Sequence, residues 1–220
     1  MNIEKTIILS DIHANILAYK AGLRQARKIG FEKLINLGDL LTYGPEPLAV
    51  IEESVNSVYH DNMIMVMGNH DKLYTDLAVG NDTYYSKLPN WIQESVDWTA
   101  NTIDISNFGK IFSWQKSYSK SGVYFAHANA LEFGDWSYLN NQDEINSTRS
   151  ALRNKKSVIG VFGHTHRPNI INHSIQKIVS SGKIGEFVID TEKSINDTCL
   201  IVNAGSVGQP RGIEKVSTMV

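Results

Sequence analysis

Three features of the sequence predict an α/β fold. Short apolar and β-branched runs at residues 6–9, 33–37 and 63–67 have the length and composition of buried strands. Between these runs, apolar residues recur at the spacing of amphipathic helices. After Pro168, several shorter strand patterns follow one another with turn residues between them. The first half of the chain therefore predicts β-α units, and the end of the chain predicts a second sheet of hairpins.

The helices of the first half are indicated by their start and stop signals. From Ile16, apolar residues follow helical spacing as far as Ala26, and Gly30 is suited to end the helix. A second, shorter helix is predicted over residues 47–55, because proline is favoured in the first turn of a helix.

The middle of the chain is less regular, apart from one amphipathic helix predicted over residues 89–102. This helix carries Trp91 and Trp98 on one face, and we expect that face to be core rather than a platform for substrate. A further helix is predicted over residues 142–155. Strands are predicted at residues 122–126, 158–163, 169–171, 176–180, 185–190 and 199–203, with hairpin turns at 172–173 and 181–182.

Length and composition favour one domain that acts on a small molecule. A chain of 220 residues is long enough for one sizeable core. A net charge of -2 gives no basic surface for a long nucleic acid. Cys199 is the single cysteine and lies in an apolar run, so we expect a buried, unreactive thiol. We find no pattern of a signal peptide or a membrane span, and the expected location is the cytoplasm.

Side chains suited to metal binding follow the predicted strands. Open α/β sheets place their ligands at the carboxyl ends of strands, and histidine and carboxylate groups are common ligands of transition metals. His164 and His166 leave one strand end together and are placed to reach two neighbouring ions, while a carboxylate such as Asp39 can bridge two cations. The candidates of this kind are Asp11, His13, Asp39, Asn69, His127, His164 and His166.

Each short pattern also has a plainer interpretation. Asp11 and His13 fit an aspartate turn that leads into a helix capped by Asn15. Asn69 and the histidine after it fit a turn with a helix N-cap, and the His-Thr-His pattern fits an exposed polar turn. The turn and ligand interpretations of the first pair are compatible.

Four motifs, in this order and each after a predicted strand, resemble the calcineurin-like metallophosphoesterase superfamily. They are Asp11-x-His13, Gly38-Asp39, Gly68-Asn69-His70-Asp71 and Gly163-His164-Thr165-His166, and the segment from Asn203 to Arg211 is similar to a last signature of its small members. The resemblance implies a four-layer α/β/β/α sandwich with two mixed sheets, as a single domain over residues 1–220. Residues 73–118 then correspond to a variable helical insert, which either caps the site or makes a dimer contact.

The same resemblance assigns roles to the candidate ligands. Asp11, His13 and His166 would hold one ion, Asn69, His127 and His164 would hold another, and Asp39 would bridge them. A hydroxide held between two ions attacks phosphorus, and both cations neutralise the developing charge. Manganese is the expected metal, with iron, zinc or nickel as alternatives.

His70 and Asp71 are the expected catalytic residues. His70 would act as a proton donor or as a clamp on the phosphoryl oxygens. Asp71 or a backbone carbonyl would hold the tautomer of His70. Expected substrate contacts are Arg211, Tyr43 and Asn129.

Two departures from the family bear on the substrate. The residues after His127 are Ala-Asn-Ala, where relatives commonly have glycine and a small polar residue, so the substrate contacts at Asn129 differ. Thr42-Tyr43 stands where the protein phosphatase and dinucleoside tetraphosphatase branches carry an arginine clamp. The closer resemblance is to the compact bacterial and archaeal phosphodiesterases.

The expected function is the metal-dependent hydrolysis of small phosphate monoesters or diesters. A non-catalytic metal-binding scaffold on the same fold is the main alternative, and a nuclease or a dinucleoside polyphosphate hydrolase is another. The scaffold alternative is weakened because His70 and every candidate ligand are present. The nuclease alternative is weakened by the missing basic surface.

Overall fold

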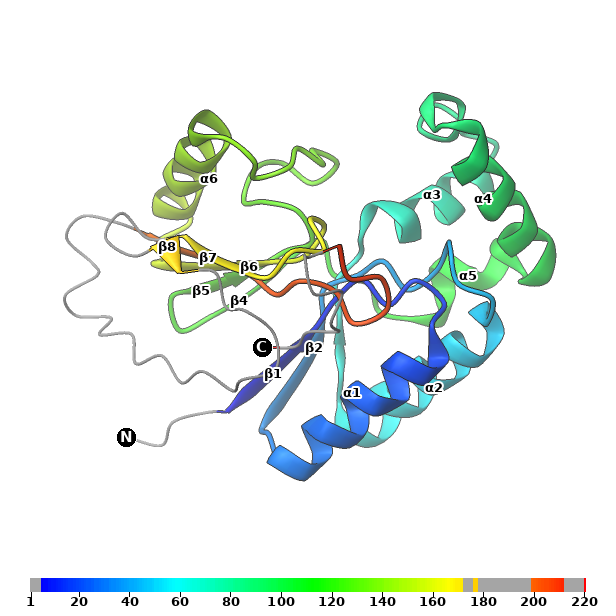
Figure 1. Ribbon diagram of the computed structural model, residues 1–220, viewed down its shortest axis with the longest axis horizontal. Coiled ribbons are helices and arrows are strands. Elements are labelled where there is room, and N and C mark those ends of the chain that lie inside the picture. The colour runs from blue at the N-terminus through cyan, green and yellow to red at the C-terminus, as the bar shows by residue number, and fades with distance from the viewer. Residues whose placement is uncertain (1–4, 172–175, 178–198, 212–219) are drawn as a thin grey trace.

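The computed structural model describes residues 5–171, 176–177, 199–211 and 220. The strand predicted at 185–190 and the turns predicted at 172–173 and 181–182 lie outside these residues, as do the last residues of the strand predicted at 176–180. Within the described part, the chain forms two sheets with helices on their outer sides (Figure 1).

The first sheet consists of the β-α units predicted for the N-terminal half. Its strands are parallel and lie in the order β1 (Thr6–Leu9), β2 (Lys33–Asn36) and β3 (Ile64–Met65). They are connected by α1 (Ile16–Ile29) and α2 (Pro47–Asp61). Ile8 of β1 and Val220 also exchange backbone hydrogen bonds of 2.6 and 3.2 Å, which is the pattern of an antiparallel pair. The end of the chain thus adds an antiparallel contact to the first sheet.

The second sheet is mixed and has six described strands. Their spatial order is β4 (Tyr118–Lys120), β5 (Val123–Phe125), β6 (Ile159–Phe162), β9 (Leu200–Asn203), β7 (Asn169–Ile171) and β8 (Gln176–Lys177). The central pairs β5–β6 and β6–β9 are parallel, whereas β4–β5, β7–β9 and β7–β8 are antiparallel. Of the strands predicted after Pro168, β7 and β8 pair antiparallel as expected for hairpins, whereas β9 lies inside the sheet and pairs parallel with β6.

The alternation of side chains along each strand creates the layers. Ile8 points between the two sheets and packs in one core with Val161 and Val202 of the second sheet. Ile7 and Leu9 point to the opposite face, where they pack with α1 and α2. Figure 1 shows both helices lying along the outer side of β1 and β2.

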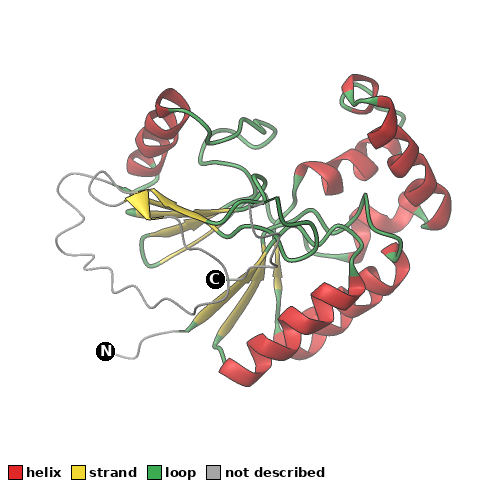
Figure 2. Ribbon diagram, viewed as in Figure 1, coloured by secondary structure: helices red, strands yellow, loops and turns green. Residues whose placement is uncertain are grey.

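The second sheet is covered on its outer face by α6 (Gln142–Asn154). Leu152 of this helix packs in a third core with Phe162, Ile201 and Tyr124. Figure 2 shows the helices on the two outer sides and the strands between them. The predicted α/β/β/α arrangement is therefore confirmed.

The segment between β3 and β4 is mainly helical. It contains α3 (Asn69–Leu77), the 3-10 turn η1 (Tyr85–Lys87), α4 (Asn90–Thr102) and α5 (Ile105–Ile111). Val96 of α4 and Phe108 of α5 are buried in the core that also contains α1 and α2. In contrast, Trp91 is 60% exposed and Trp98 is 48% exposed, so the prediction that these tryptophans form core is wrong. The helix buries the face that carries Val96 and Thr99 instead.

Two element boundaries differ from the predictions for local reasons. α2 continues to Asp61, where Asn62 in the left-handed conformation (φ 51°) caps it, a conformation that asparagine tolerates well. β3 is shorter than predicted, and Gln115 pairs with the residues at its end: the N–H of Met67 donates to the carbonyl oxygen of Gln115 at 2.9 Å, and the N–H of Gln115 donates to that of Met65 at 2.8 Å. Among the described helices, none is both long and apolar enough to cross a bilayer.

Candidate metal centre

The carboxyl ends of the strands meet at one place, and the predicted ligands lie there in strained turns. Five of them have a positive φ, between 47° and 65°, although none is glycine: Asp11, His13, Asp39, His164 and His166. Residues other than glycine adopt this conformation at a cost, and such strain is concentrated at functional sites. The turns after β1, β2 and β6 therefore have conformations that serve the site rather than local stability.

Four of the predicted ligands form a first buried group. Asp11, His13, Asp39 and His166 each offer one ligand atom, and these atoms all lie within 4.8 Å of one another. Nε2 of His166 lies 3.1 Å from Oδ1 of Asp11, and 3.1 Å from Nε2 of His13. All four side chains are buried, so the group is shielded from bulk water.

A second buried group shares Asp39 with the first. It consists of Asp39, His127 and His164, again with ligand atoms within 4.8 Å of one another. Oδ2 of Asp39 lies 3.3 Å from Nε2 of His127 and 3.8 Å from Nε2 of His13. One carboxylate oxygen therefore lies between the two groups, where it can contact an ion in each.

Asn69 belongs beside the second group. Its Oδ1 lies 3.0 Å from Nε2 of His127, while its amide nitrogen donates to the hydroxyl of Tyr84 at 3.0 Å. The hydrogen bond to Tyr84 orients the amide so that its oxygen faces the histidine. The oxygen is thereby available as a neutral ligand.

Backbone carbonyls fix the tautomer of each histidine. The Nδ1 atoms of His13, His127 and His166 lie 2.9, 2.9 and 2.6 Å from the carbonyl oxygens of Leu41, Leu37 and Gln209. Nε2 of His164 lies 2.9 Å from the carbonyl oxygen of Trp136. A carbonyl only accepts, so each of these nitrogens donates. In the neutral rings, the other nitrogen of each histidine then has a lone pair that is free to bind a cation.

This arrangement brings acceptors face to face. Nε2 of His13, Nε2 of His166 and Oδ1 of Asp11 meet with no hydrogen between them when both rings are neutral, and Oδ1 of Asp11 has no hydrogen-bond partner. A buried acceptor without a partner costs about 1–3 kcal/mol, and more when it is charged. A cation placed among these atoms would satisfy all of them, so the residues fit a metal ion.

Burial and the neighbouring carboxylates compete in setting the pKa values of the centre. Burial lowers the pKa of His13 to about 3 and that of His164 to about 4. Burial acts to lower the pKa of His127 as well, but the charge and hydrogen bond of Asp39 outweigh it and raise the pKa to about 9. The pKa of Asp11 falls to about 2 because the neighbouring ring of His166 outweighs the effect of burial. The carboxylates thus stay ionised and attract positive charge to the centre.

Two glycines allow the turns to approach the ligands closely. A Cβ on Gly68 would lie 2.2 Å from Oδ1 of Asp39, and a Cβ on Gly163 would lie 1.9 Å from Oγ of Ser10. Both distances are far shorter than atomic contact allows, so a side chain at either position would displace a ligand. These glycines belong to the motifs on which the predicted site rests.

His70 lies next to the centre, as expected for its role. Its ring is 5.3 Å from the ring of His13, and its backbone N–H donates to Oδ1 of Asp39 at 2.9 Å. Nε2 lies 3.3 Å from the hydroxyl of Tyr43, whereas Nδ1 has no hydrogen-bond partner. Burial lowers the pKa of His70, which keeps the ring neutral near pH 7.

Asp71 does not hold the tautomer of His70. Its two carboxylate oxygens accept the backbone N–H groups of Asp39, Leu40 and Gly68 at 2.7, 3.0 and 2.9 Å. The carboxylate ties the turn after β2 to the turn after β3, and it therefore positions Asp39 rather than the ring of His70. The expected contact between Asp71 and that ring is corrected accordingly.

The three expected substrate contacts have different surroundings. Tyr43 packs against His13 and His70, with ring centroids 4.8 and 5.1 Å apart. The guanidinium of Arg211 lies 5.9 Å from the centroid of the Tyr43 ring. Burial raises the pKa of Tyr43 to about 12, so its hydroxyl stays protonated. Tyr43 thus lies between His70 and the guanidinium of Arg211, in contact with each.

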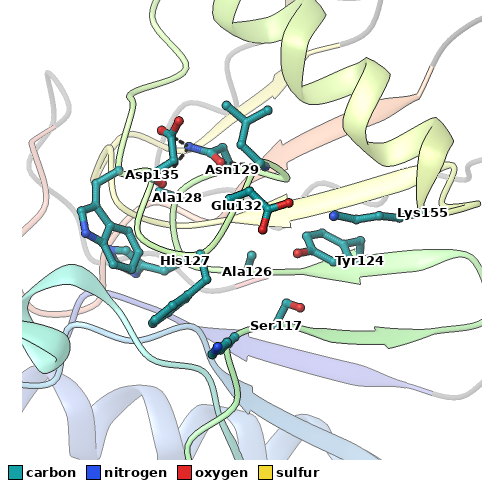
Figure 3. A pocket seen from close by; sticks show the side chains of 13 residues that line it. Ser117, Tyr124, Ala126, His127, Ala128, Asn129, Glu132, Asp135 and Lys155 are labelled. Carbon is teal, nitrogen blue, oxygen red and sulfur yellow. Dashed lines mark hydrogen bonds between the residues drawn. The ribbon is translucent and has the colours of Figure 1, made fainter.

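Asn129 is committed to its own loop. Its amide nitrogen donates to the carbonyl oxygens of Asp135 and Ser137 at 3.1 and 3.2 Å, and its side-chain oxygen accepts the N–H of Leu131 at 2.9 Å. Asn129 and His127 both line a pocket of about 190 Å³. Figure 3 shows the hydrogen bonds between Asn129 and Asp135 at the wall of this pocket. The side chain shapes this loop, in contrast to the substrate contact expected for it.

The site also uses several residues that are not among the predicted site residues. Tyr84 orients Asn69, and Tyr138 stacks on His164 with ring centroids 4.3 Å apart. Trp136 supplies the carbonyl that fixes His164. The aromatic content of the loop around Trp136 and Tyr138 indicates a pocket wall, and the pocket lining includes Trp136. Nothing in the sequence connects Tyr84 with Asn69.

Comparisons with known proteins agree with this description. The model of the calcineurin-like phosphoesterase superfamily domain matches residues 5–220. The uncharacterized protein MJ0912 of Methanocaldococcus jannaschii is 31% identical over 215 residues, which cover 96% of this chain and 79% of that protein. A metallophosphoesterase from Sphaerobacter thermophilus has a TM-score of 0.68 at 23% identity, covering 96% of this chain and 79% of the other. The hypothetical protein PH1004 of Pyrococcus horikoshii OT3 has a TM-score of 0.69 at 17% identity, covering 94% and 79%.

The two solved structures share the fold, and the family model spans nearly the whole chain. Together with the buried groups of aspartate and histidine able to bind metal ions, these matches agree with the resemblance that the four motifs indicate. The chain belongs to the calcineurin-like phosphoesterase superfamily.

Proposed function

We propose that this protein is a metal-dependent hydrolase that cleaves phosphate esters of small molecules. The observation that carries the proposal is the meeting of lone-pair atoms. Nε2 of His13 and Nε2 of His166 lie 3.1 Å apart beside the unpartnered Oδ1 of Asp11, and Asp39 belongs to a second group of the same kind. Two adjoining groups with this chemistry are suited to a pair of divalent cations.

The residues would hold two ions, with Asp39 available to both. Asp11, His13 and His166 would hold one, and Asn69, His127 and His164 would hold the other. Imidazole and carboxylate ligands without thiolates suit Mn(II) or Fe, Zn or Ni better than Ca, and we propose manganese. When bound, two such ions supply an activated water as nucleophile and neutralise the charge of the reacting phosphate.

The other polar residues of the site would act on the substrate directly. His70, neutral because burial lowers its pKa, has one N–H to donate to a phosphoryl or leaving oxygen. The hydroxyl of Tyr43 lies at hydrogen-bond distance, 3.3 Å, from Nε2 of His70, and this contact orients the imidazole ring. Arg211, which is exposed beside Tyr43, offers positive charge to the phosphate.

A small substrate suits the rest of the molecule. The net charge of -2 does not favour a long polyanion. We expect the enzyme to work in the cytoplasm, consistent with a single cysteine, Cys199, that is free and buried.

The direct test is hydrolysis by chelator-stripped protein to which Mn(II), Ni(II), Zn(II) or Mg(II) is added back. Bis-p-nitrophenyl phosphate and p-nitrophenyl phosphate would be compared side by side. Metal-dependent release of p-nitrophenol supports the proposal, and the ratio of the two rates separates diesterase from monoesterase activity. Binding of two metal equivalents without turnover of either ester would contradict hydrolysis and favour the non-catalytic scaffold.

A further inference from the structure

An exposed aromatic surface adjoins the metal centre. Trp91 of α4 is 60% exposed, although tryptophan side chains are usually largely buried. Its ring stacks on that of Tyr43, with centroids 6.0 Å apart and an angle of 29° between the planes. Because more than half of Trp91 stays accessible beyond this contact, part of its ring is free to stack on another planar group.

Tyr43 connects this surface to the reacting centre. The centroid of its ring also lies 4.8 Å from that of His13 and 5.1 Å from that of His70. Contacts therefore run without interruption from a metal-binding histidine, through Tyr43, to the exposed Trp91. A molecule whose phosphate occupied the metal centre would extend past these two rings.

The surface is held in place by the helical segment. The backbone N–H of Tyr43 donates to Oγ of Ser95 at 2.8 Å, one turn along α4 from Trp91. Tyr43 itself has a φ of 70°, so this turn is strained and depends on such an anchor. Figure 1 shows α3 and α4 on the same side of the molecule, beyond the ends of β1 and β2.

We propose that Tyr43 and Trp91 form a stacking surface for a planar aromatic ring of the substrate, so that the preferred esters carry a nucleobase or an aryl group. The inference rests on the phosphoesterase function proposed above and adds the class of substrate. Stacking on an aromatic side chain tolerates different rings, because every ring presents a π-face. The guanidinium of Arg211, 5.9 Å from the Tyr43 ring, adds positive charge beside this surface for the phosphate of the same molecule.

The test uses pairs of substrates that differ only in the ring. Adenosine 5′-monophosphate and ribose 5-phosphate release phosphate from the same kind of alcohol. Bis-p-nitrophenyl phosphate and methyl p-nitrophenyl phosphate release the same phenol. In at least one pair, we expect the manganese-loaded protein to hydrolyse the ester with the additional ring faster. A preference in the first pair indicates a nucleobase, and a preference in the second pair indicates an aryl group.

Trp98 provides a matched control, since it is a 48% exposed tryptophan on the same helix, seven residues further on. Trp91→Ala should lower the preference for the ring by about tenfold, within the range that base stacking gives, and Trp98→Ala should leave it unchanged. Trp91→Phe retains a ring and should restore most of the preference. Because Trp91 is exposed, its replacement removes little from the core.

A second readout does not depend on turnover. Stacking of adenosine 5′-monophosphate on Trp91 should quench tryptophan fluorescence of the metal-free protein, less so in Trp91→Ala and equally in Trp98→Ala. If the wild type hydrolyses esters and both Trp91→Ala and Trp98→Ala keep its ring preference, the stacking surface is refuted and the proposed function stands. The same holds if the preference is lost in Tyr138→Ala instead. If no ester is hydrolysed with any metal, the proposed function itself fails.

Discussion

Asp39 is the side chain that the two buried groups of aspartate and histidine share. Its Oδ2 lies between Nε2 of His13 and Nε2 of His127, and it belongs to both groups. Asp39→Asn removes a negative charge from the point where two cations would be closest. We therefore expect this variant to lose metal binding and ester hydrolysis together, by at least about a hundredfold in activity.

Metal content by atomic emission and p-nitrophenyl ester hydrolysis would be measured on the same preparations. Asp82→Asn, at an exposed position, is the control for the change of charge and should behave as the wild type. An Asp39→Asn protein that kept its metal and its activity would refute the bridging role.

Substitution of His70 should lower catalysis without lowering metal binding. It adjoins the centre but is not one of the residues that offer a ligand atom to either group. His70→Ala should keep the metal content of the wild type and lose about a hundredfold in kcat, the range for loss of a general acid or base. The exposed His60 is the matched control, and His60→Ala should retain full activity. Unchanged turnover in His70→Ala would remove the catalytic role assigned to it.

At the scale of residues, the sequence indicates which aspartate and histidine side chains meet better than it indicates the groups that orient them. A polar side chain directly after an apolar strand is visible in the sequence, and this is why Asp11, Asp39 and His127 could be identified. The groups that orient them are mostly backbone carbonyls, such as those of Leu37 and Leu41. A carbonyl leaves no residue-specific signal, and its use depends on turns that only tertiary packing fixes. For the same reason, the sequence does not predict that the side chain of Asn129 forms hydrogen bonds to the backbone of its own loop.

At the scale of elements, the turn after β6 makes a sharp prediction. A Cβ on Gly163 would lie 1.9 Å from Oγ of Ser10 and 2.5 Å from Oδ2 of Asp11. Gly163→Ala should therefore displace Asp11, lower metal binding, and reduce the free energy of unfolding by about 2–3 kcal/mol. Urea denaturation and metal content would measure the two effects.

Gly22 of α1 is the control for this substitution. Its nearest neighbours would lie at ordinary contact distance, 3.5 and 3.7 Å from a Cβ. Alanine is favoured over glycine within a helix, so Gly22→Ala should be neutral or stabilise the protein by up to about 1 kcal/mol. Equal effects of the two substitutions would show that close packing around Gly163 does not hold the site together.

The elements also show where periodicity is informative and where it is not. The spacing of apolar residues correctly predicts that α1 and α4 are helices. It does not say which face of α4 meets the core, because Val96 and Trp91 lie on neighbouring stripes of the same helix. The packing partners of α4 decide this, and they lie in distant parts of the sequence, including the turn that carries Tyr43.

At the scale of the whole molecule, the two sheets converge on one site. β1 and β2 deliver Asp11, His13 and Asp39, whereas β5 and β6 deliver His127 and His164. The turn after β9 closes the site, since Val207 and Gly208 donate backbone N–H groups to Ser10 and Asp11 at 2.9 and 3.0 Å. Local strand and helix patterns predict β-α units and a second sheet, and the resemblance of the motifs to the superfamily predicts the four layers. The order β6–β9–β7 within the second sheet depends on long-range pairing that no local pattern encodes.

Because the ligands come from both sheets, metal binding should stabilise the entire domain. An ion that binds only the folded protein adds about 2.7 kcal/mol at a free concentration one hundred times its Kd. For a chain of 220 residues, each kcal/mol raises Tm by about 2–4 °C. We therefore expect Mn(II) to raise the Tm of chelator-stripped protein by about 5–10 °C, measured by calorimetry. Asp39→Asn should show a much smaller rise in Tm, because both buried groups lose the negative charge of the Asp39 carboxylate. An equal rise in Tm for both proteins would mean that the ions bind elsewhere on the folded chain. Stabilisation by a centre that contains Asp39 must weaken when this carboxylate is neutralised, because the ions bind there less tightly.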